Sequence, residues 1–193
     1  DEIAAQRGMV VLSSFDDARI VAGQGTVGLE IADQCHELGV APDQVLVCCG
    51  GGGLISGSAT ALKARLPDVS VHPVEPEDFD DTARSLAGGE RVANAPEARS
   101  ICDALLTDMP GQLTYDIMRE HITAGLAVSD AEVREAMRFA FRNLKIVVEP
   151  GGAVGLAAVL AGKADTAGKT TAIIFSGGNV DAELFASIQT ERT

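Results

Sequence analysis

Hydrophobic residues follow two alternating patterns along most of the chain. Short continuous apolar runs, such as Val-Leu-Val-Cys-Cys at residues 45–49, are typical of strands buried on both faces of a sheet. Between such runs, apolar residues recur every three or four positions, as at Val27, Ile31, Cys35 and Leu38, which predicts amphipathic helices. Strands that alternate with helices predict an α/β fold, with a mostly parallel sheet flanked by helices.

The same patterns place each expected element. Strands are expected at residues 9–12, 19–22, 44–49, 69–74, 122–128 and 170–175. Helices are expected at about residues 26–38, 53–65, 81–86, 112–121, 129–143, 152–161 and 181–189. Gly39 should end the first helix, a capping box from Ser129 to Glu132 should begin the fifth, and Asp181 should cap the last. Ligands of parallel α/β sheets bind beyond the carboxyl ends of the strands, so the turns that follow the strands hold the candidate chemistry.

Composition narrows the class of protein. A length of 193 residues is typical of one domain, or of a domain and a fraction. With 15 basic and 28 acidic residues the net charge is −13. The chain therefore lacks the excess of basic residues that a nucleic-acid-binding protein needs. There is no apolar run of about 20 residues, so no membrane span is expected. The four cysteines show no C-x-x-C spacing, and we expect reduced core thiols and a cytoplasmic protein rather than a zinc site.

The strongest chemical signal is the run Gly50–Gly53, which follows a predicted buried strand and precedes a predicted helix. Residues without side chains let consecutive backbone amides turn toward one anion, and the helix N-terminus adds about half a positive charge. The run therefore predicts a phosphate site without a lysine, and no Gly-Lys-Ser/Thr follows to make it a Walker A loop. The structural alternative is a tightly packed turn, but four glycines at one junction carry a large entropic cost.

Two further turns are candidates. Gly23–Gly28 matches the G-x-G-x-x-G pattern of dinucleotide sites and follows the strand predicted at residues 19–22. The acidic residue expected on a second strand about 20 positions later is missing, which disfavours a nicotinamide or flavin cofactor and hence an oxidoreductase. Ser176 follows the last predicted strand and precedes two glycines, so its hydroxyl is expected near the ligand crevice.

An acidic loop follows the strand predicted at residues 69–74. Five carboxylates lie within residues 75–81. Carboxylates and backbone carbonyls are the ligands of Mg²⁺ and Ca²⁺, but such a cluster is more commonly a solvated loop. On the residues alone, the solvated loop is the favoured interpretation.

Taken in order, these turns resemble the fold-type II pyridoxal-phosphate (PLP) enzymes, and within them the threonine/serine dehydratase and serine racemase family. The resemblance runs from about Gly8 to the C-terminus, and the tetraglycine run and the Ser-Gly-Gly-Asn turn are its most specific parts. The matching segments are residues 22–26, 50–53, 74–76, 100–103, 148–153 and 176–181. The family carries the 22–26 segment where its chain re-enters the large domain, which explains the match to the dinucleotide pattern without a dinucleotide.

The resemblance implies two sites. The first is a PLP site. The phosphate of PLP would be bound by Gly50, Gly51, Gly52, Gly53 and the amide of Leu54. Ser176 would bind the pyridine nitrogen, and Glu149 would lie near the ring. At the second, relatives in the racemase-like branch hold Mg²⁺ or another divalent cation. The matching ligands are Glu75, the carbonyl of Phe79 and Asp81, and this match favours a cation over the solvated loop.

The chain also departs from the family pattern. The family forms its Schiff base on a lysine in a Ser-Phe-Lys-like motif, followed by a Ser-Gly-Asn-His-like substrate loop, and neither is present. None of the four lysines has that context, so no catalytic residue is assigned in this chain. We expect residues 1–14 to end the small domain and residues 15–193 to form the C-terminal part of the large PLP-binding domain. Cys-Asp-Ala at residues 102–104, where relatives commonly have Ala-Asp-Gly, leaves the substrate open.

The resemblance implies a dehydratase (ammonia-lyase) that converts L-threonine or L-serine to a 2-keto acid and ammonia. We expect this chain alone to be inactive, and expect it to need the missing N-terminal part, an amino-acid substrate and assembly as a homodimer. A serine or aspartate racemase and a hydroxyaspartate dehydratase are alternatives within the family. From another class, a non-catalytic module that binds PLP or phosphate remains open.

Overall fold

The structure is a computed structural model that describes residues 2–122 and 124–191. Its helices are α1 Glu2–Arg7, α2 Ala18–Glu37, α3 Gly53–Arg65, α4 Asp81–Gly88, α5 Gln112–His121, α6 Asp130–Phe139, α7 Pro150–Leu160 and α8 Ala182–Thr190. Its strands are β1 Gln44–Cys48, β2 Ser70–Pro76, β3 Leu126–Val128 and β4 Thr171–Ile173. Short 3₁₀ turns lie at Glu77–Phe79 and Asp103–Leu105, and a π-helical turn at Ala140–Leu144 follows α6.

The four strands form one parallel sheet in the order β3-β2-β1-β4. β1 lies between β2 and β4, with Cys48 opposite Val74 and Leu46 opposite Ile173. All three strand pairings are parallel, which confirms the predicted α/β class. The arrangement also brings the turns after β1, β2 and β4 to one edge of the sheet.

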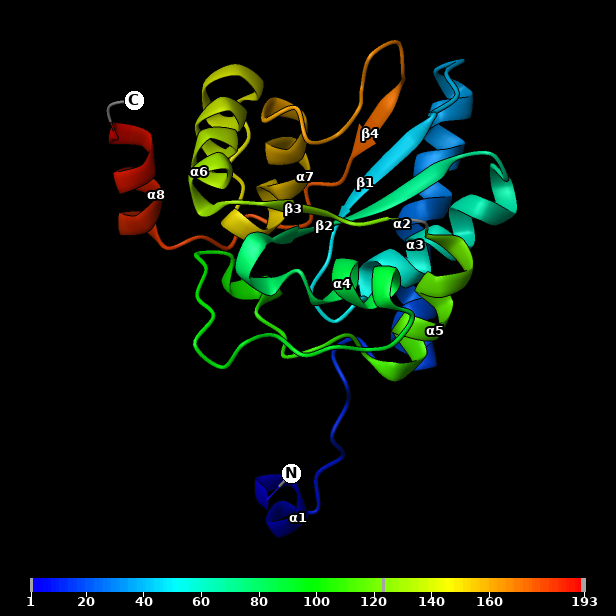
Figure 1. Cartoon of the computed structure of the whole chain (residues 1–193), viewed down its shortest axis with the longest axis vertical. Helices are drawn as coiled ribbons and strands as arrows, with labels where there is room; N and C mark the ends of the chain where they lie inside the picture. The colour runs from blue at the N-terminus through cyan, green and yellow to red at the C-terminus, as the bar shows by residue number, and fades with distance from the viewer. Residues whose placement is uncertain (1, 123, 192–193) are drawn as a thin grey trace.

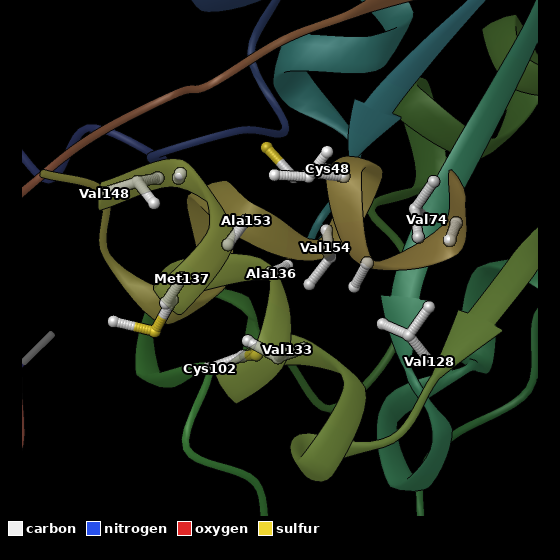
Figure 2. Close-up of a cluster of buried hydrophobic side chains, with 14 of the residues drawn as sticks. Cys48, Val74, Cys102, Val128, Val133, Ala136, Met137, Val148, Ala153 and Val154 are labelled. Atoms are coloured by element: carbon white, nitrogen blue, oxygen red, sulfur yellow. The ribbon is translucent and has the colours of Figure 1, made fainter. Parts of the chain in front are cut away.

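Helices cover both faces of the sheet, and β1 shows why (Figure 1). Every residue of β1 is buried, and its side chains alternate between two hydrophobic cores. Leu46 and Cys48 join the core formed with α6, α7 and α8, whereas Val45 and Val47 join the core formed with α3 and α5. Figure 2 shows the first core, where Cys48, Val74 and Val128 of the strands approach Ala153 and Val154 of α7. The continuous apolar pattern of β1 thus reflects burial on both faces.

Several elements match their predicted bounds. α3 and α5 begin and end at the predicted residues, and Gly39 follows α2 with a left-handed backbone at a φ of 68°. The capping box of Ser129 and Glu132 begins α6, and Asp181 caps α8 by accepting from the amides of Glu183 and Leu184. β3 and β4 are shorter than predicted, and residue 123 of the predicted 122–128 strand lies outside the described residues.

The strand predicted at residues 19–22 is wrong, because those residues form the first turn of α2. Asp17 caps this helix through the amide of Arg19, so the helix begins eight residues before the predicted start at Thr26. The G-x-G-x-x-G match therefore lies inside a helix and follows no strand. A Cβ on Gly28 would collide with the backbone of Ser58 in α3, and one on Gly25 would lie 3.3 Å from the Gly57 carbonyl oxygen. These glycines let two helices pack backbone to backbone.

The strand predicted at residues 9–12 is also wrong within the described residues. Met9, Val10, Val11 and Leu12 belong to no regular element, and their exposed fractions lie between 59% and 83%. A strand needs a neighbouring strand for its backbone hydrogen bonds, and the described sheet offers none here. In Figure 1 this segment connects α1, which buries no residue, to the body of the molecule.

No helix of the described residues is long and apolar enough to cross a membrane. All four cysteines are free thiols, and Cys48, Cys49 and Cys102 are buried. The expected core position is therefore confirmed for three of the four cysteines, whereas Cys35 in α2 is only half-buried.

Candidate cofactor-binding site

The glycine run forms the turn between the end of β1 and the start of α3. Gly52 caps α3 with a left-handed backbone at a φ of 92°, a conformation that residues with a side chain rarely adopt. Added Cβ atoms would also collide with neighbours: with the Phe15 ring at Gly51, and with Met118 and Thr114 at Gly52. The run is therefore a tightly packed turn, in which Gly51, Gly52 and Gly53 are buried and Gly50 is half-buried.

Backbone amides of this turn, those of Gly51 and Gly52 among them, are free to bind a ligand. Gly51 and Gly52 donate no backbone hydrogen bond to any of the residues that the structure describes. Both line a cavity of about 270 Å³, together with Gly50, Gly53 and Leu54 at the N-terminus of α3. Free amides at a helix N-terminus are suited to an anion, and the predicted phosphate residues do share one cavity.

Ser176 lines the same cavity from the neighbouring strand. It follows β4, so the parallel pairing of β1 with β4 places its hydroxyl at the edge of the sheet that also holds the glycine loop. Cys48, the last residue of β1, also lines the cavity. Burial raises the pKa of the Cys48 thiol despite a hydrogen bond with Ser176, so this group is a neutral neighbour of the hydroxyl.

Glu149 lies just before α7, beside the turn that contains Ser176. Its backbone amide donates to the Gly177 carbonyl oxygen at 3.1 Å, and a Cβ on Gly177 would collide with its carboxylate. Partial burial raises the pKa of Glu149, and the nearby charge of Asp103 raises it further. Glu149 does not line the cavity itself, and its contact with the site passes through Gly177.

The predicted cation residues surround the start of α4. Glu75 is fully buried, and its carboxylate oxygens accept from the amides of Thr82 at 2.9 Å and Ala83 at 2.8 Å. Burial, and then the charge of Asp81, raise the pKa of Glu75 to about 8. Asp81 accepts from Asn94 Nδ2 on one oxygen at 2.5 Å, whereas its other oxygen is buried without a partner. Burial raises the pKa of Asp81 to about 6.

The described residues contain no group of three or more His, Cys, Asp or Glu side chains that could hold a metal ion. The predicted set does not depend on such a group, because its third ligand is the backbone carbonyl of Phe79. Glu75 and Asp81 are nevertheless two neighbouring buried carboxylates, and one oxygen of Asp81 has no partner among the described residues. The cation itself stays a prediction.

Three contributors to this region were absent from the sequence prediction. Phe15 packs against Gly51 and Gly53 and lines the cavity. Asp16 accepts from three backbone amides at the start of α5, and the Thr114 hydroxyl donates to the Gly51 carbonyl oxygen at 2.6 Å. The contacts of Asp16 and Thr114 join residues that are 63 to 98 positions apart, so no local pattern indicates them.

The four lysines lie away from the cavity. Lys63 and Lys145 donate to carbonyl oxygens near their own helices. Lys163 pairs with Glu77 and Glu132, and Lys169 pairs with Asp165. None of the lysines lines the cavity that holds the glycine loop.

Comparison with known proteins decides the family. Residues 1–177 match the family model described as pyridoxal-phosphate dependent enzyme. The chain belongs to this family. The matches to threonine deaminases and serine racemases confirm the predicted resemblance and the fold class.

Three relatives illustrate the range of the match. L-threo-3-hydroxyaspartate ammonia-lyase from Pseudomonas sp. is 40% identical over 186 residues, which cover 96% of this chain and 57% of that protein. The crystal structure of the T.th. threonine deaminase superposes with a TM-score of 0.88 at 42% identity, over 93% of this chain and 65% of that one. Maize serine racemase superposes with a TM-score of 0.86 at 35% identity, over 96% of this chain and 56% of the racemase chain. The chain thus spans about half the length of the curated relatives it matches.

Proposed function

We propose that this chain is the C-terminal portion of a PLP-dependent ammonia-lyase that acts on L-threonine, L-serine or a related hydroxy amino acid. The observation that carries the proposal is the glycine loop, whose free Gly51 and Gly52 amides share one cavity with Ser176. The similarity to a hydroxyaspartate ammonia-lyase and to a threonine deaminase supports the reaction class. The net reaction would convert the amino acid to a 2-keto acid and ammonia.

The residues of the cavity suit the parts of PLP. The amides of residues 50–54 would bind the phosphate, and among the described residues no lysine or arginine lines the cavity to do so. Ser176 would donate a hydrogen bond to the pyridine nitrogen. A neutral hydroxyl at this place would leave that nitrogen without a full proton, which would suit the loss of a β-hydroxyl group from the amino acid. When bound, PLP supplies the electron withdrawal that labilises the α-proton of the amino acid.

Glu149 would act at the side of the ring. Its raised pKa follows from partial burial and the neighbouring Asp103. A carboxyl group held by the Gly177 turn can accept or donate a hydrogen bond at the edge of the site, and its closeness to the Ser176 turn supports the assignment.

We also propose a divalent cation, Mg²⁺ or Ca²⁺, bound by Glu75, the Phe79 carbonyl and Asp81. The unpartnered buried oxygen of Asp81 supports this site, and each Glu75 oxygen keeps a lone pair beyond the amide it accepts. The cation would lie at the start of α4 and would join that helix to the end of β2. Its role would be structural, because these residues do not line the cofactor cavity.

The domain assignment is part of the proposal. Residues 1–14 would end the small domain and residues 15–193 would form the C-terminal part of the large domain. The exposed segment at residues 9–12 and the contacts made by Phe15 and Asp16 support a boundary at that point. Four free thiols support a reducing compartment such as the cytoplasm. A homodimer would be the working assembly.

A protein that contains this chain and the missing N-terminal part tests the reaction. With PLP it should release ammonia and a 2-keto acid from threonine, serine or hydroxyaspartate. If none of the three amino acids gives a product, the proposed ammonia-lyase activity is contradicted. Chiral analysis of recovered serine and aspartate separates the racemase alternative, which the similarity to maize serine racemase keeps open.

The isolated chain should give no turnover, because all four lysines are engaged outside the cavity. Borohydride reduction with PLP followed by peptide mapping checks this directly. A specific PLP adduct on one lysine, together with ammonia release, would contradict it. An N-terminal part without a Ser-Phe-Lys-like motif would instead favour a non-catalytic binding module.

A further inference from the structure

One carbonyl oxygen of the glycine loop receives two hydrogen bonds from the start of α5. The Thr114 hydroxyl donates to the Gly51 carbonyl oxygen at 2.6 Å, and the Gly111 amide donates to the same oxygen at 3.2 Å. Thr114 has no exposed surface, so water does not replace this bond when it is lost. The orientation of the Gly51 carbonyl is therefore set from outside the loop.

That orientation determines where the next amide points. The Gly51 carbonyl and the Gly52 N–H belong to one planar trans peptide unit, so they point in opposite directions. With the carbonyl held against the start of α5, the Gly52 N–H is directed away from it. The cavity that Gly52 lines contains no residue of α5. The hydrogen bond from Thr114 thus presents a free amide toward the cavity.

The start of α5 is itself held by Asp16. One carboxylate oxygen accepts from the amides of Leu113 at 2.8 Å and Thr114 at 3.2 Å, and the other accepts from Gln112 at 3.0 Å. A negative charge at a helix N-terminus is favourable, and here it comes from a residue 98 positions away from Thr114. Asp16, Thr114 and Gly51 therefore form a continuous hydrogen-bonded path that ends at the glycine loop.

We propose that Thr114 is a positioning residue for the cofactor phosphate. Its hydroxyl holds the Gly51–Gly52 peptide so that the Gly52 amide donates to a phosphate oxygen, and Asp16 keeps Thr114 in place. This inference rests on the proposed function and extends it, because it assigns the geometry of the phosphate loop to two residues outside the loop.

The test compares the binding of PLP with that of pyridoxal, which lacks the phosphate, by equilibrium dialysis on the 193-residue chain. Both ligands can react with surface lysines through an aldehyde, and all variants keep the same four lysines, so this background cancels when the ratio is compared between variants. Thr114→Val should lower that ratio about three- to tenfold, the loss of one hydrogen bond. Thr114→Ser keeps the hydroxyl and should restore the ratio. Thr60→Val removes a hydroxyl that donates to the Ser56 carbonyl within α3, and should leave the ratio unchanged.

The outcomes separate the two claims. If Thr114→Val and the wild type share one ratio, the positioning role is overturned and the phosphate site stands. If the wild type binds PLP no better than pyridoxal, the phosphate site is overturned and the positioning role with it. Should Thr114→Val fail to fold, as judged by circular dichroism, Asp16→Asn provides the second variant. Asp16→Asn replaces one acceptor oxygen by an amide nitrogen and removes the negative charge at the N-terminus of α5. An unchanged ratio in that variant would overturn the positioning role.

Discussion

At the scale of single residues, glycines that look alike in the sequence have different physical roles. Gly52 and Gly89 both have a left-handed backbone, at φ values of 92° and 78°. A Cβ on Gly89 would meet nothing within 4 Å, whereas a Cβ on Gly52 would lie 2.8 Å from the Met118 side chain and 3.0 Å from Thr114. The first glycine is required only for its backbone angle, and the second for the angle and for the space.

Substituting these two glycines separates the two effects. Gly89→Ala should lower the free energy of unfolding by about 1 kcal/mol, the cost of backbone strain alone. Gly52→Ala should lower it by about 2–4 kcal/mol, because the collision with buried neighbours adds to the strain. Urea unfolding followed by circular dichroism measures both variants. Equal losses would show that the space around Gly52 is not limiting.

The carboxylates of the proposed cation site make a second prediction at this scale. Millimolar Mg²⁺ or Ca²⁺ should raise the melting temperature, because an ion that binds only the folded state stabilises it. Asp81→Asn should abolish this shift, because the substitution removes the negative charge of the carboxylate whose buried oxygen has no partner. Asp78→Asn removes an exposed carboxylate of the same loop and serves as the control. A thermal shift that survives in Asp81→Asn would contradict the assignment.

At the scale of elements, α2 and α3 show how a motif can mislead. Gly23, Gly25 and Gly28 have the spacing of a dinucleotide loop, yet all three lie within a helix of 20 residues. Gly23 faces open space, whereas Gly28 packs against the backbone of Ser58. Helix packing, and not ligand binding, explains why glycine is required at position 28.

Two substitutions in α2 test this explanation. Gly28→Ala should destabilise the protein by about 1–3 kcal/mol, because the added methyl group forces α2 away from α3. Gly23→Ala should instead stabilise it by about 0.5–1 kcal/mol, since alanine is the better helix former and meets no neighbour. Thermal unfolding of the two variants measures the difference. Destabilisation by Gly23→Ala would argue against its exposed position in the helix.

At the scale of the whole molecule, the N-terminal segment is attached at one point. α1 buries no residue, and residues 9–12 are exposed apolar side chains. The first strong contacts with the body come from Phe15 at the glycine loop and from Asp16 at α5. The segment before Phe15 therefore contributes little to the stability of the remaining chain.

Truncation tests this division. Removal of residues 1–11 should change the free energy of unfolding by less than about 0.5 kcal/mol, because no buried side chain is lost. Removal of residues 1–16 should lower it by at least about 1 kcal/mol, since the carboxylate cap of α5 is lost as well. Differential scanning calorimetry of the two truncated chains gives the comparison. A large loss on the shorter truncation would place the boundary before Ser13.

Much of the fold could be predicted from the sequence, because β1 and α3 carry strong local patterns. The continuous apolar run before Gly50 favours a strand buried on both faces, and the glycine run that follows it favours a turn. The strands predicted at residues 9–12 and 19–22 were wrong for one reason. Short apolar runs of this kind fit a strand, a helix turn or an exposed segment equally well. Only the presence or absence of a packed neighbour distinguishes these outcomes.

The sequence by itself determined most of the alternation of strands and helices, the glycine loop and the place of Ser176 after a strand, because each depends on local pattern. The assignment of Glu149, Glu75 and Asp81 to sites came from the resemblance to the family and stays a prediction. The tertiary structure decided which glycines serve packing and which face a cavity. It also decided that Asp16 and Thr114, far apart in the chain, support the Gly51–Gly52 peptide. The physical reason is that hydrogen bonds and packing contacts form between neighbours in space, and spatial neighbours are chosen by the fold of the whole chain.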